Sequence, residues 1–269
     1  MTSLTLYLTS LLIVLVYTTY FFFIAKERKN NSIIDIAYGP GFIVTAFFLA
    51  CIQLTYNPLP TFGSIIFILI IIWGARLSYR IFKKNRVKGE DFRYKAWREE
   101  WSKQGHDYFL VRSYVQIFVL QGIIISLVLV PFTLSVSADL LNTSGYVLAL
   151  LFGLALWIVG FVFEAVGDAQ LDRFIKHKHV HGLTIMKSGL WKYTRHPNYF
   201  GESMMWWGIS IIAFGATMSL FVFVSPFIIT GLLLFVSGVP MLEKKWEGNE
   251  EWEHYKKKTS VFFPLPPKH

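Results

Sequence analysis

Apolar and polar positions alternate along the chain in long blocks, so that seven apolar runs are separated by shorter polar segments. The runs fall near residues 4–25, 33–54, 61–82, 111–132, 145–167, 198–217 and 219–241. Each has about the 20 residues that a helix needs to cross roughly 30 Å of hydrocarbon. The pattern predicts an all-α polytopic membrane protein with seven transmembrane helices. The first run has no basic segment before it and is longer than a typical signal-peptide core, so we expect it to be a membrane helix.

The composition agrees with this class. Of the 269 residues, 54% are hydrophobic and 17% are aromatic, as is typical of a membrane protein. No repeat or obvious linker divides the sequence, so we expect residues 1–269 to form a single domain. The one cysteine, Cys51, lies in an apolar run, which argues against a disulfide framework or a cysteine metal site.

The positions of the basic residues predict an orientation in the membrane. Of the 26 Lys and Arg residues, three fall in 26–29, eleven in 76–112, six in 173–195 and six in 244–268. The intervening loops have none. Because basic loops stay in the cytoplasm, we expect the N-terminus outside and the C-terminus in the cytoplasm. This topology and anionic lipid headgroups account for the net charge of +9 without a nucleic-acid partner.

Two of the basic segments have the pattern of amphipathic helices at the membrane surface. Trp97 and Trp101 alternate with charges after the third run, and Trp246, Trp252 and Tyr255 recur at helical spacings in the C-terminal tail. In the first segment, phosphate groups are possible partners of four cations, although a solvated or lipid-facing charge run explains them as well. These cations are Arg86, Lys88, Arg93 and Arg98.

Three carboxylates fall within or at the edge of the apolar runs: Asp35, Glu164 and Glu202. An ionisable group inside a membrane span is costly unless it is paired or functional. All three would lie at a similar shallow depth on the cytoplasmic side, which predicts one polar cavity that opens to the cytosol. The alternative is that each acid pairs with a nearby Arg or backbone group only to hold helices together.

Asp35 begins the segment DIAYGPGF, in which residues 39–41 can bend or break the helix. Asp35 and Tyr38 share a helical face, and that face is a candidate substrate site. Polar residues on adjacent turns at the end of the third run are further candidates for this site. Snorkelling to the membrane interface is an alternative explanation for the two arginines among them. These polar residues are Arg76, Tyr79 and Arg80.

The most distinctive stretch is GLWKYTRHPNYFGE at residues 189–202, where a basic aromatic loop leads into an apolar helix. Pro197 suits the first turn of that helix. The free N–H groups and positive dipole end of such a helix favour anions, and Lys192 and Arg195 add positive charge. We interpret the stretch as a phosphate or carboxylate site beside the buried acid Glu202. The alternative is an ordinary interfacial loop, because aromatic and basic residues gather at membrane surfaces.

Further polar groups cluster at the end of the fifth run. Glu164 and Asp168 are one helical turn apart and can accept hydrogen bonds from ribose hydroxyls or an amide. The segment HKHVH then supplies His177, His179 and His181. Their i, i+2 spacing converges on a metal only in an extended segment, and no carboxylate or thiol nearby completes the set. We therefore expect no metal site.

From residue 31 to the C-terminus, the motifs resemble the steroid 5-alpha-reductase-like integral membrane family, in its bacterial-type branch of unknown function. The matching segments are NSIIDIAYGPGF, WGARLSYR with KGEDFRYKAWR, FVFEAVGDAQL, GLWKYTRHPNYFGE with WWG, VSGVPMLEK and the aromatic basic tail. The motif RHPxY is less specific by itself, because it also occurs in isoprenylcysteine and phospholipid methyltransferases. The resemblance implies a bacterial inner membrane, or the endoplasmic reticulum if the protein is eukaryotic.

The resemblance implies an enzyme that binds NADPH from the cytoplasmic side and delivers hydride to a C=C bond conjugated to the carbonyl of a lipophilic substrate. Asp35 matches the family's acid at the substrate carbonyl in place though not in length, and Tyr79 approximately matches its tyrosine. Charge that develops on such a carbonyl oxygen requires hydrogen-bond donors, which a Tyr hydroxyl or a protonated Asp can supply. The implied cofactor contacts are Asp168, Trp191, Tyr193, Arg195, His196, Asn198, Tyr199, Glu202 and Tyr255.

Two other functions stay open from the sequence. One is an S-adenosylmethionine-dependent methyltransferase in which His196, Tyr199 and Glu202 would hold the cofactor. The other is a non-catalytic protein that binds membrane lipids. No GxGxxG motif follows a strand, so the phosphates of a dinucleotide would rest on basic loops and helix ends rather than on a Rossmann fold.

Overall fold

A computed structural model of the chain describes residues 2–85, 89–138, 145–177 and 184–268. Across these ranges the regular elements are helices, which confirms the all-α class, and Thr194 and Ser260 form an isolated parallel bridge. The helices group into two compact units. Unit 1 comprises residues 1–143 and 213–224, and unit 2 comprises residues 144–212 and 225–269. The prediction of a single domain stays a prediction.

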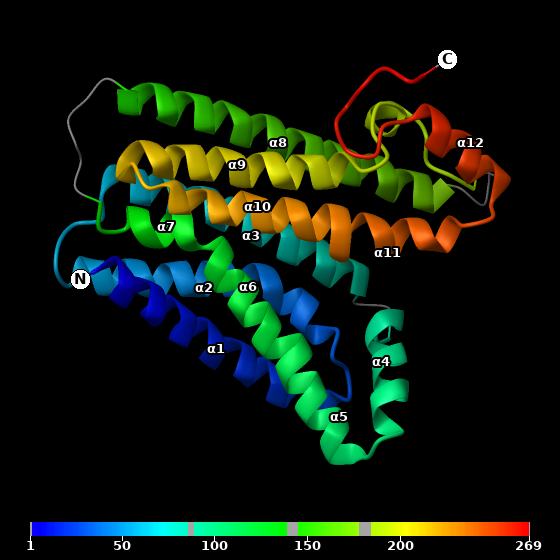
Figure 1. Cartoon of the computed structure of the whole chain (residues 1–269), viewed down its shortest axis with the longest axis horizontal. Helices are drawn as coiled ribbons and strands as arrows, with labels where there is room; N and C mark the ends of the chain where they lie inside the picture. The colour runs from blue at the N-terminus through cyan, green and yellow to red at the C-terminus, as the bar shows by residue number, and fades with distance from the viewer. Residues whose placement is uncertain (1, 86–88, 139–144, 178–183, 269) are drawn as a thin grey trace. The chain divides into compact units, whose positions relative to one another are not determined.

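In unit 1, α2 packs between two long neighbours, α1 and α3 (Figure 1). The bounds of its helices are Ser3–Arg28 (α1), Ile33–Leu54 (α2), Thr61–Asn85 (α3), Phe92–Ser102 (α4), His106–Ser113 (α5), Leu120–Val128 (α6) and Val130–Ser135 (α7). A π-helical segment, η1 (Tyr114–Val119), joins α5 to α6. The α2–α3 contact is close because a Cβ added to Gly39 would lie 2.6 Å from the Gly74 carbonyl oxygen.

Helix α2 continues without a break through Pro40, although residues 39–41 were candidates for a break. A proline inside a helix removes one backbone hydrogen bond and disturbs the preceding turn. The bond that Pro40 cannot make would end at the Ile36 carbonyl. One residue further on, the Tyr17 hydroxyl of α1 donates to the Ala37 carbonyl at 2.9 Å, so α1 binds the backbone of this turn. Hydrogen bonds from neighbouring helices are one reason why a proline is tolerated in an apolar helix.

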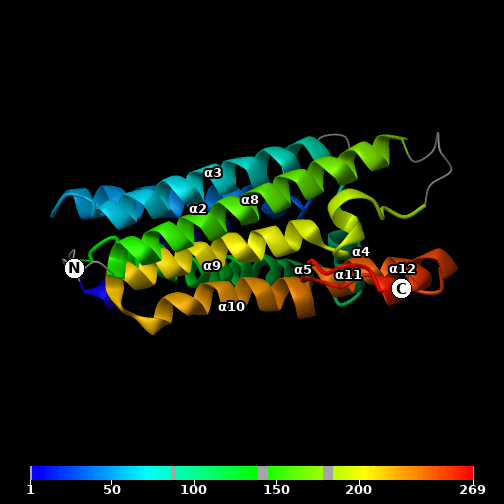
Figure 2. The same cartoon turned by 90° about the horizontal axis from the view of Figure 1, so that it is seen from above.

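In unit 2, α8 and α9 run side by side in both views (Figures 1 and 2). The helices that lie wholly or mostly in this unit are Gly145–His177 (α8), Pro197–Thr217 (α9), Val224–Gly231 (α10), Val239–Glu243 (α11) and Glu250–Lys258 (α12). Glycines at intervals of seven residues let the two backbones touch. A Cβ on Gly153 would lie 2.6 Å from the Gly208 carbonyl oxygen, and one on Gly160 would lie 2.6 Å from that of Gly201. Small residues allow this close packing between apolar helices.

Among the described residues, six helical segments are long and apolar enough to cross a membrane, which indicates an integral membrane protein. They are Ser3–Arg28, Ile33–Leu54, Thr61–Lys84, His106–Val128, Tyr146–His177 and Leu220–Trp246. The remaining predicted span, 198–217, forms α9 but is not among the six. The polar residues of its first turns lower its hydropathy. Both segments predicted to be amphipathic contain a helix, α4 and α12, and their location at a membrane surface stays a prediction.

Candidate functional site

The predicted anion site of unit 2 is a short loop that precedes α9. Gly189 has a φ of 64°, a left-handed conformation that glycine adopts without strain. The chain then forms one 3-10 turn, η2 (Gly189–Lys192), and enters α9 at Pro197. The Leu190 N–H donates to the Gln170 side chain of α8 at 2.9 Å. The loop is therefore held against the end of α8 before it reaches the helix.

Arg195 joins this loop to the C-terminal tail. Its Nη1 donates to the carbonyl oxygens of Lys256 and Thr259 at 2.9 and 2.8 Å. Its Nε donates to Glu243 Oε1 at 2.9 Å, and its Nη2 donates to Glu243 Oε2 at 3.4 Å. The backbone N–H of Arg195 donates to the Ser260 carbonyl at 2.9 Å. All these contacts of Arg195 are with groups of the protein itself. We call this set of contacts the Arg195 clamp.

His196 belongs to the same network, since its Nε2 lies 3.0 Å from Glu243 Oε1. The imidazole is buried, with 4% of the residue exposed. The ring of Tyr199 stacks on it, with centroids 5.4 Å apart and an interplanar angle of 7°. One carboxylate, Glu243, therefore serves two adjacent residues of the loop.

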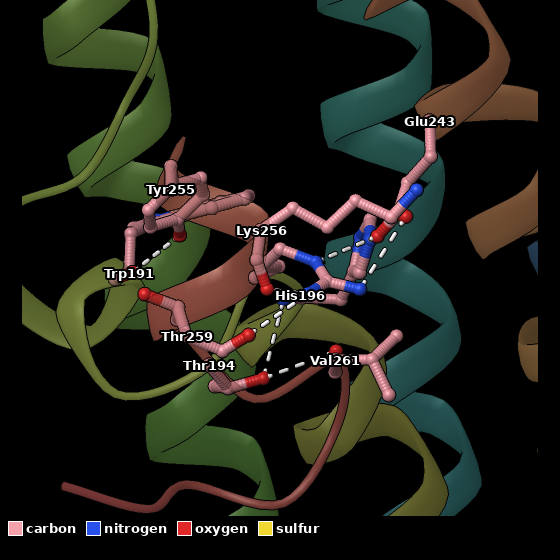
Figure 3. A network of polar contacts seen from close by, with 9 residues as sticks. Trp191, Thr194, His196, Glu243, Tyr255, Lys256, Thr259 and Val261 are labelled. Carbon is pink, nitrogen blue, oxygen red and sulfur yellow. Dashed lines mark hydrogen bonds and ion pairs between the residues drawn. The ribbon is translucent and has the colours of Figure 1, made fainter. Parts of the chain in front are cut away.

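Trp191 and Tyr255 make a second link between the loop and the tail (Figure 3). The indole Nε1 of Trp191 donates to the Gly167 carbonyl of α8 at 3.0 Å. The Tyr255 hydroxyl donates to the Trp191 carbonyl. Burial raises the pKa of Tyr255 and outweighs the opposing effect of the nearby Arg195 charge. The phenol is therefore a neutral hydrogen-bond donor at physiological pH.

The acids of α8 lie against the first turns of α9. Glu164 and Asp168 are each 3% exposed. A Cβ on Gly201 would lie 2.5 Å from the Glu164 nitrogen, and one on Gly167 would lie 3.1 Å from the Pro197 ring. The predicted contacts on α8 and on the loop are thus brought together in one helical hairpin.

Two predicted contacts differ from this group, Tyr193 in its exposure and Asn198 in its lack of a hydrogen-bond partner for the side-chain oxygen. Tyr193 is 43% exposed, and the Lys192 ammonium lies 6.0 Å from its ring centroid. The side-chain oxygen of Asn198 is buried and has no hydrogen-bond partner among the described residues. A buried acceptor without a partner is costly, so Asn198 offers a bound molecule a place for a donor.

Asp35 of unit 1 is held by α4. Arg93 Nη2 donates to Asp35 Oδ2 at 2.9 Å, and the Tyr94 hydroxyl donates to Asp35 Oδ1 at 2.5 Å. Asp35 is therefore paired with an arginine, as the helix-holding alternative predicted.

The groups around Asp35 extend to the start of α4. Asp91 accepts the Arg93 backbone N–H at 3.1 Å and its Nε at 2.8 Å. Burial acts to raise the pKa of Asp91, but these hydrogen bonds outweigh it and lower the pKa. Burial, followed by the negative charge of Asp35, raises the pKa of Tyr94 well above its ordinary value. Tyr94 therefore stays protonated.

The other predicted substrate residues, Tyr79 and Tyr38, lie near a lysine and a phenylalanine of their own helices. Tyr79 is 67% exposed, and the Lys83 ammonium lies 5.9 Å from its ring centroid. The Tyr38 ring packs edge-on against Phe42 at 5.1 Å. The structure thus places Tyr94 of α4 at the acid, where sequence comparison pointed to Tyr79 of α3.

Residues 21–259 match the model of a family described as proteins of unknown function, DUF1295. The chain belongs to this family. No curated protein and no solved structure matches the chain significantly. The family description names no activity, so the resemblance to steroid 5-alpha-reductase-like proteins stays a prediction.

Some predicted residues of this DUF1295 chain fall outside the described ranges: Arg86, Lys88, His179 and His181. His177 is described, and its Nδ1 lies 2.8 Å from the Arg173 carbonyl oxygen. Within the described ranges, no group of three or more His, Cys, Asp or Glu side chains could hold a metal ion.

Sequence reasoning did not single out two residues that are central to the geometry described above, Glu243 in unit 2 and Tyr94 in unit 1. Glu243 accepts hydrogen bonds from Arg195 in the clamp. The sequence feature that could have identified it is an acid at the end of the last apolar run, in VSGVPMLEK. Tyr94 lies in the segment DFRYKAWR, where its aromatic neighbours made it look like an ordinary surface-helix residue. Its 4% exposure distinguishes it from them.

Proposed function

We propose that this DUF1295 protein is an NADPH-dependent membrane reductase that adds hydride to a carbonyl-conjugated C=C bond of a steroid-like or other lipophilic substrate. The observation that carries the proposal is the concentration of buried ionisable groups where the 189–196 loop enters α9. Glu164, Asp168, Arg195 and His196 are 3, 3, 8 and 4% exposed. Burying so many ionisable groups is costly, and ionisable groups within a membrane span are typical of functional sites.

The residues around this hairpin fit part of a dinucleotide. Asn198 presents a buried acceptor without a partner, which suits an amide or ribose hydroxyl. A pocket of about 360 Å³ next to the loop is lined by Arg173, His177 and Ser188. These groups can bind a phosphate. Arg195 is unsuited to that role because its guanidinium already donates to the Lys256 and Thr259 carbonyls. Bound NADPH would supply the hydride, and the protein would position it.

In unit 1, the Asp35–Tyr94 pair is the candidate for recognition of the substrate carbonyl. Tyr94 is protonated, and its one O–H donates to Asp35, whose other oxygen accepts from Arg93. To serve a substrate carbonyl, this O–H would turn from Asp35 to the carbonyl oxygen. Hydride addition to the β-carbon moves the C=C electron pair onto the α-carbon and the carbonyl oxygen. A phenol O–H can stabilise that oxygen, and a proton taken up at the α-carbon completes the saturated ketone. Tyr94 replaces Tyr79 in the proposal.

The proposed topology makes the cofactor accessible. Seven spans with the basic loops in the cytoplasm, the N-terminus outside and the C-terminus inside would place residues 189–202 on the cytoplasmic face. Soluble NADPH is available there. The apolar helices would admit a lipophilic substrate from the bilayer.

Ligand titration of the purified protein in lipid nanodiscs tests the cofactor. We expect NADPH to raise the melting temperature. Asp168→Asn and Asn198→Ala should each increase the NADPH concentration needed for half of this rise by at least tenfold. Lys258→Gln, an exposed site on α12, is the matched control and should leave NADPH binding unchanged. Stabilisation by S-adenosylmethionine but not by NADPH would refute the reductase proposal, and a response to neither would favour a non-catalytic lipid-binding protein.

Turnover tests the Asp35–Tyr94 pair separately. With a steroid enone as substrate, we expect Tyr94→Phe and Asp35→Asn to slow NADPH oxidation at least tenfold while NADPH affinity stays within twofold of the wild type. Tyr79→Phe is the matched control, because its exposed hydroxyl is predicted to play no part. Equal activity of Tyr94→Phe and wild type would exclude Tyr94 from the reaction.

A further inference from the structure

A second pocket of about 360 Å³ lies in unit 1, where α1 ends and α5 begins. Its polar wall includes the cations Lys26, Lys29 and Arg98 together with Ser102 and His106. Among the described residues, no Asp or Glu lines it. The remainder of the wall is apolar and includes Phe22 and Phe109. The pocket therefore combines uncompensated positive charge with an apolar surface.

The cations of this pocket differ in how far their charges are compensated. Arg98 donates to Glu90 from Nε at 2.9 Å and from Nη2 at 2.7 Å, and its guanidinium lies 4.9 Å from the Phe109 ring centroid. Lys26 and Lys29 are exposed, and their side chains make no ion pair or hydrogen bond with the described part of the chain. The net positive charge of the pocket thus comes from the two lysines.

The turn that carries these lysines is fixed by the backbone. Lys29 ends α1 with a φ of 48°, and its N–H donates to the carbonyls of Ala25 and Lys26. A residue other than glycine in this left-handed conformation is uncommon. The next residues are also held, because the Asn31 N–H donates to Glu90 Oε1 at 2.7 Å. Lys26 and Lys29 both line the pocket from this turn.

The pocket is located where two candidate membrane spans end. Ser3–Arg28 finishes beside it, and His106–Val128 starts beside it. This is the boundary between hydrocarbon and water, where the phosphates of phospholipids lie and where basic residues attract anionic headgroups. A site for a water-soluble phosphate ester would not require the phenylalanine side chains.

We infer that this pocket binds the phosphate of an anionic membrane lipid. Lys26 and Lys29 neutralise the phosphate, and Ser102 and His106 supply hydrogen-bond donors. Phe22 and Phe109 contact the glycerol and the first part of the acyl chains. The site is independent of the cofactor site of unit 2, and it would bind lipid whether or not the protein is a reductase.

The test compares thermal unfolding in nanodiscs of phosphatidylcholine alone and of phosphatidylcholine with phosphatidylglycerol. Ligand binding stabilises the native state, and we expect the anionic lipid to raise the wild-type melting temperature by about 5 °C. Lys26→Gln/Lys29→Gln should lose at least two thirds of this increment. The charge-matched control, Lys257→Gln/Lys258→Gln on the exposed face of α12, should retain it.

Further measurements identify the ligand and distinguish a loss of lipid binding from a loss of folding. Soluble glycerol phosphate, added to phosphatidylcholine nanodiscs, should give no saturable stabilisation. An equal response to it would overturn the lipid assignment. Lys26→Arg/Lys29→Arg should keep more than half of the increment, and native mass spectrometry should detect less bound phosphatidylglycerol on the Gln variant than on the wild type. A full increment in the Gln variant, or an equal loss in the control, would refute the site.

Discussion

Removal of the Arg195 side chain is the sharpest perturbation that the structure offers. Arg195→Ala deletes four hydrogen bonds and leaves Glu243, whose side chain is 13% exposed, without its arginine. Loss of one partner from a buried ion pair costs about 3–5 kcal/mol. We therefore expect a loss of about 4 kcal/mol. At about 2–4 °C per kcal/mol for a chain of this size class, the melting temperature should fall by about 8–16 °C.

Variants at the same position separate charge from geometry. Arg195→Lys keeps the positive charge but cannot reproduce the planar fork that reaches Glu243 and two carbonyls at once. We expect it to recover less than half of the loss. In a double-mutant cycle with Glu243→Gln, the coupling energy should exceed about 1 kcal/mol, since the two side chains share hydrogen bonds.

Two assays measure the effect. Thermal unfolding in nanodiscs gives the melting temperature, and limited trypsin digestion reports whether the tail is released, because three lysines follow one another at residues 256–258. Lys192→Ala, an exposed site in the same loop, is the control and should change neither result. A fall of less than about 2 °C for Arg195→Ala, with unchanged cleavage of the tail, would refute the clamp.

Three further predictions follow from packing and titration. Gly201→Ala should lower the free energy of unfolding by about 1–3 kcal/mol in thermal denaturation, because its Cβ would collide with the Gly160 carbonyl. Asp91→Asn should melt below wild type at pH 7, and the difference should shrink as pH falls below 3.8, because Arg93 lowers the folded-state pKa. Tyr255→Phe should lose about 1–3 kcal/mol at pH 7. Because the folded-state pKa of Tyr255 is raised, its contribution is lost above pH 10, and the variant should then decline less steeply than wild type.

Each of these has an outcome that would contradict it. Gly231→Ala is the control for the glycine contact, because no described atom lies within 4 Å of its Cβ position; equal effects of the two glycine variants would exclude a steric cause. A constant gap between Asp91→Asn and wild type from pH 7 to pH 3 would show that the ion pair with Arg93 contributes nothing. Parallel alkaline curves for Tyr255→Phe and wild type would show that another group causes the decline.

Sequence reasoning located the Arg195 loop but assigned the arginine to a ligand. Arg195 instead binds Glu243, 48 positions later, and the Thr259 carbonyl, 64 positions later. Likewise, Asp35 was identified as an intramembrane acid, whereas its partners Arg93 and Tyr94 lie 58 and 59 positions away. A spacing pattern describes neighbours along one helix and carries no information about such distant pairs.

What the sequence determined by itself was local. Runs of apolar residues specified helices, so that the predicted range 33–54 coincides with α2, and the aromatic spacing of the tail predicted α12. Both follow from hydrophobic length and the helical period, which act within one segment. Only the tertiary structure decided that Arg195 and His196 share Glu243, that Tyr94 rather than Tyr79 meets Asp35, and that Lys26 and Lys29 line a pocket with α4 and α5. These outcomes depend on which helices pack together, because a buried charge takes whichever partner the packed chain brings within hydrogen-bond distance.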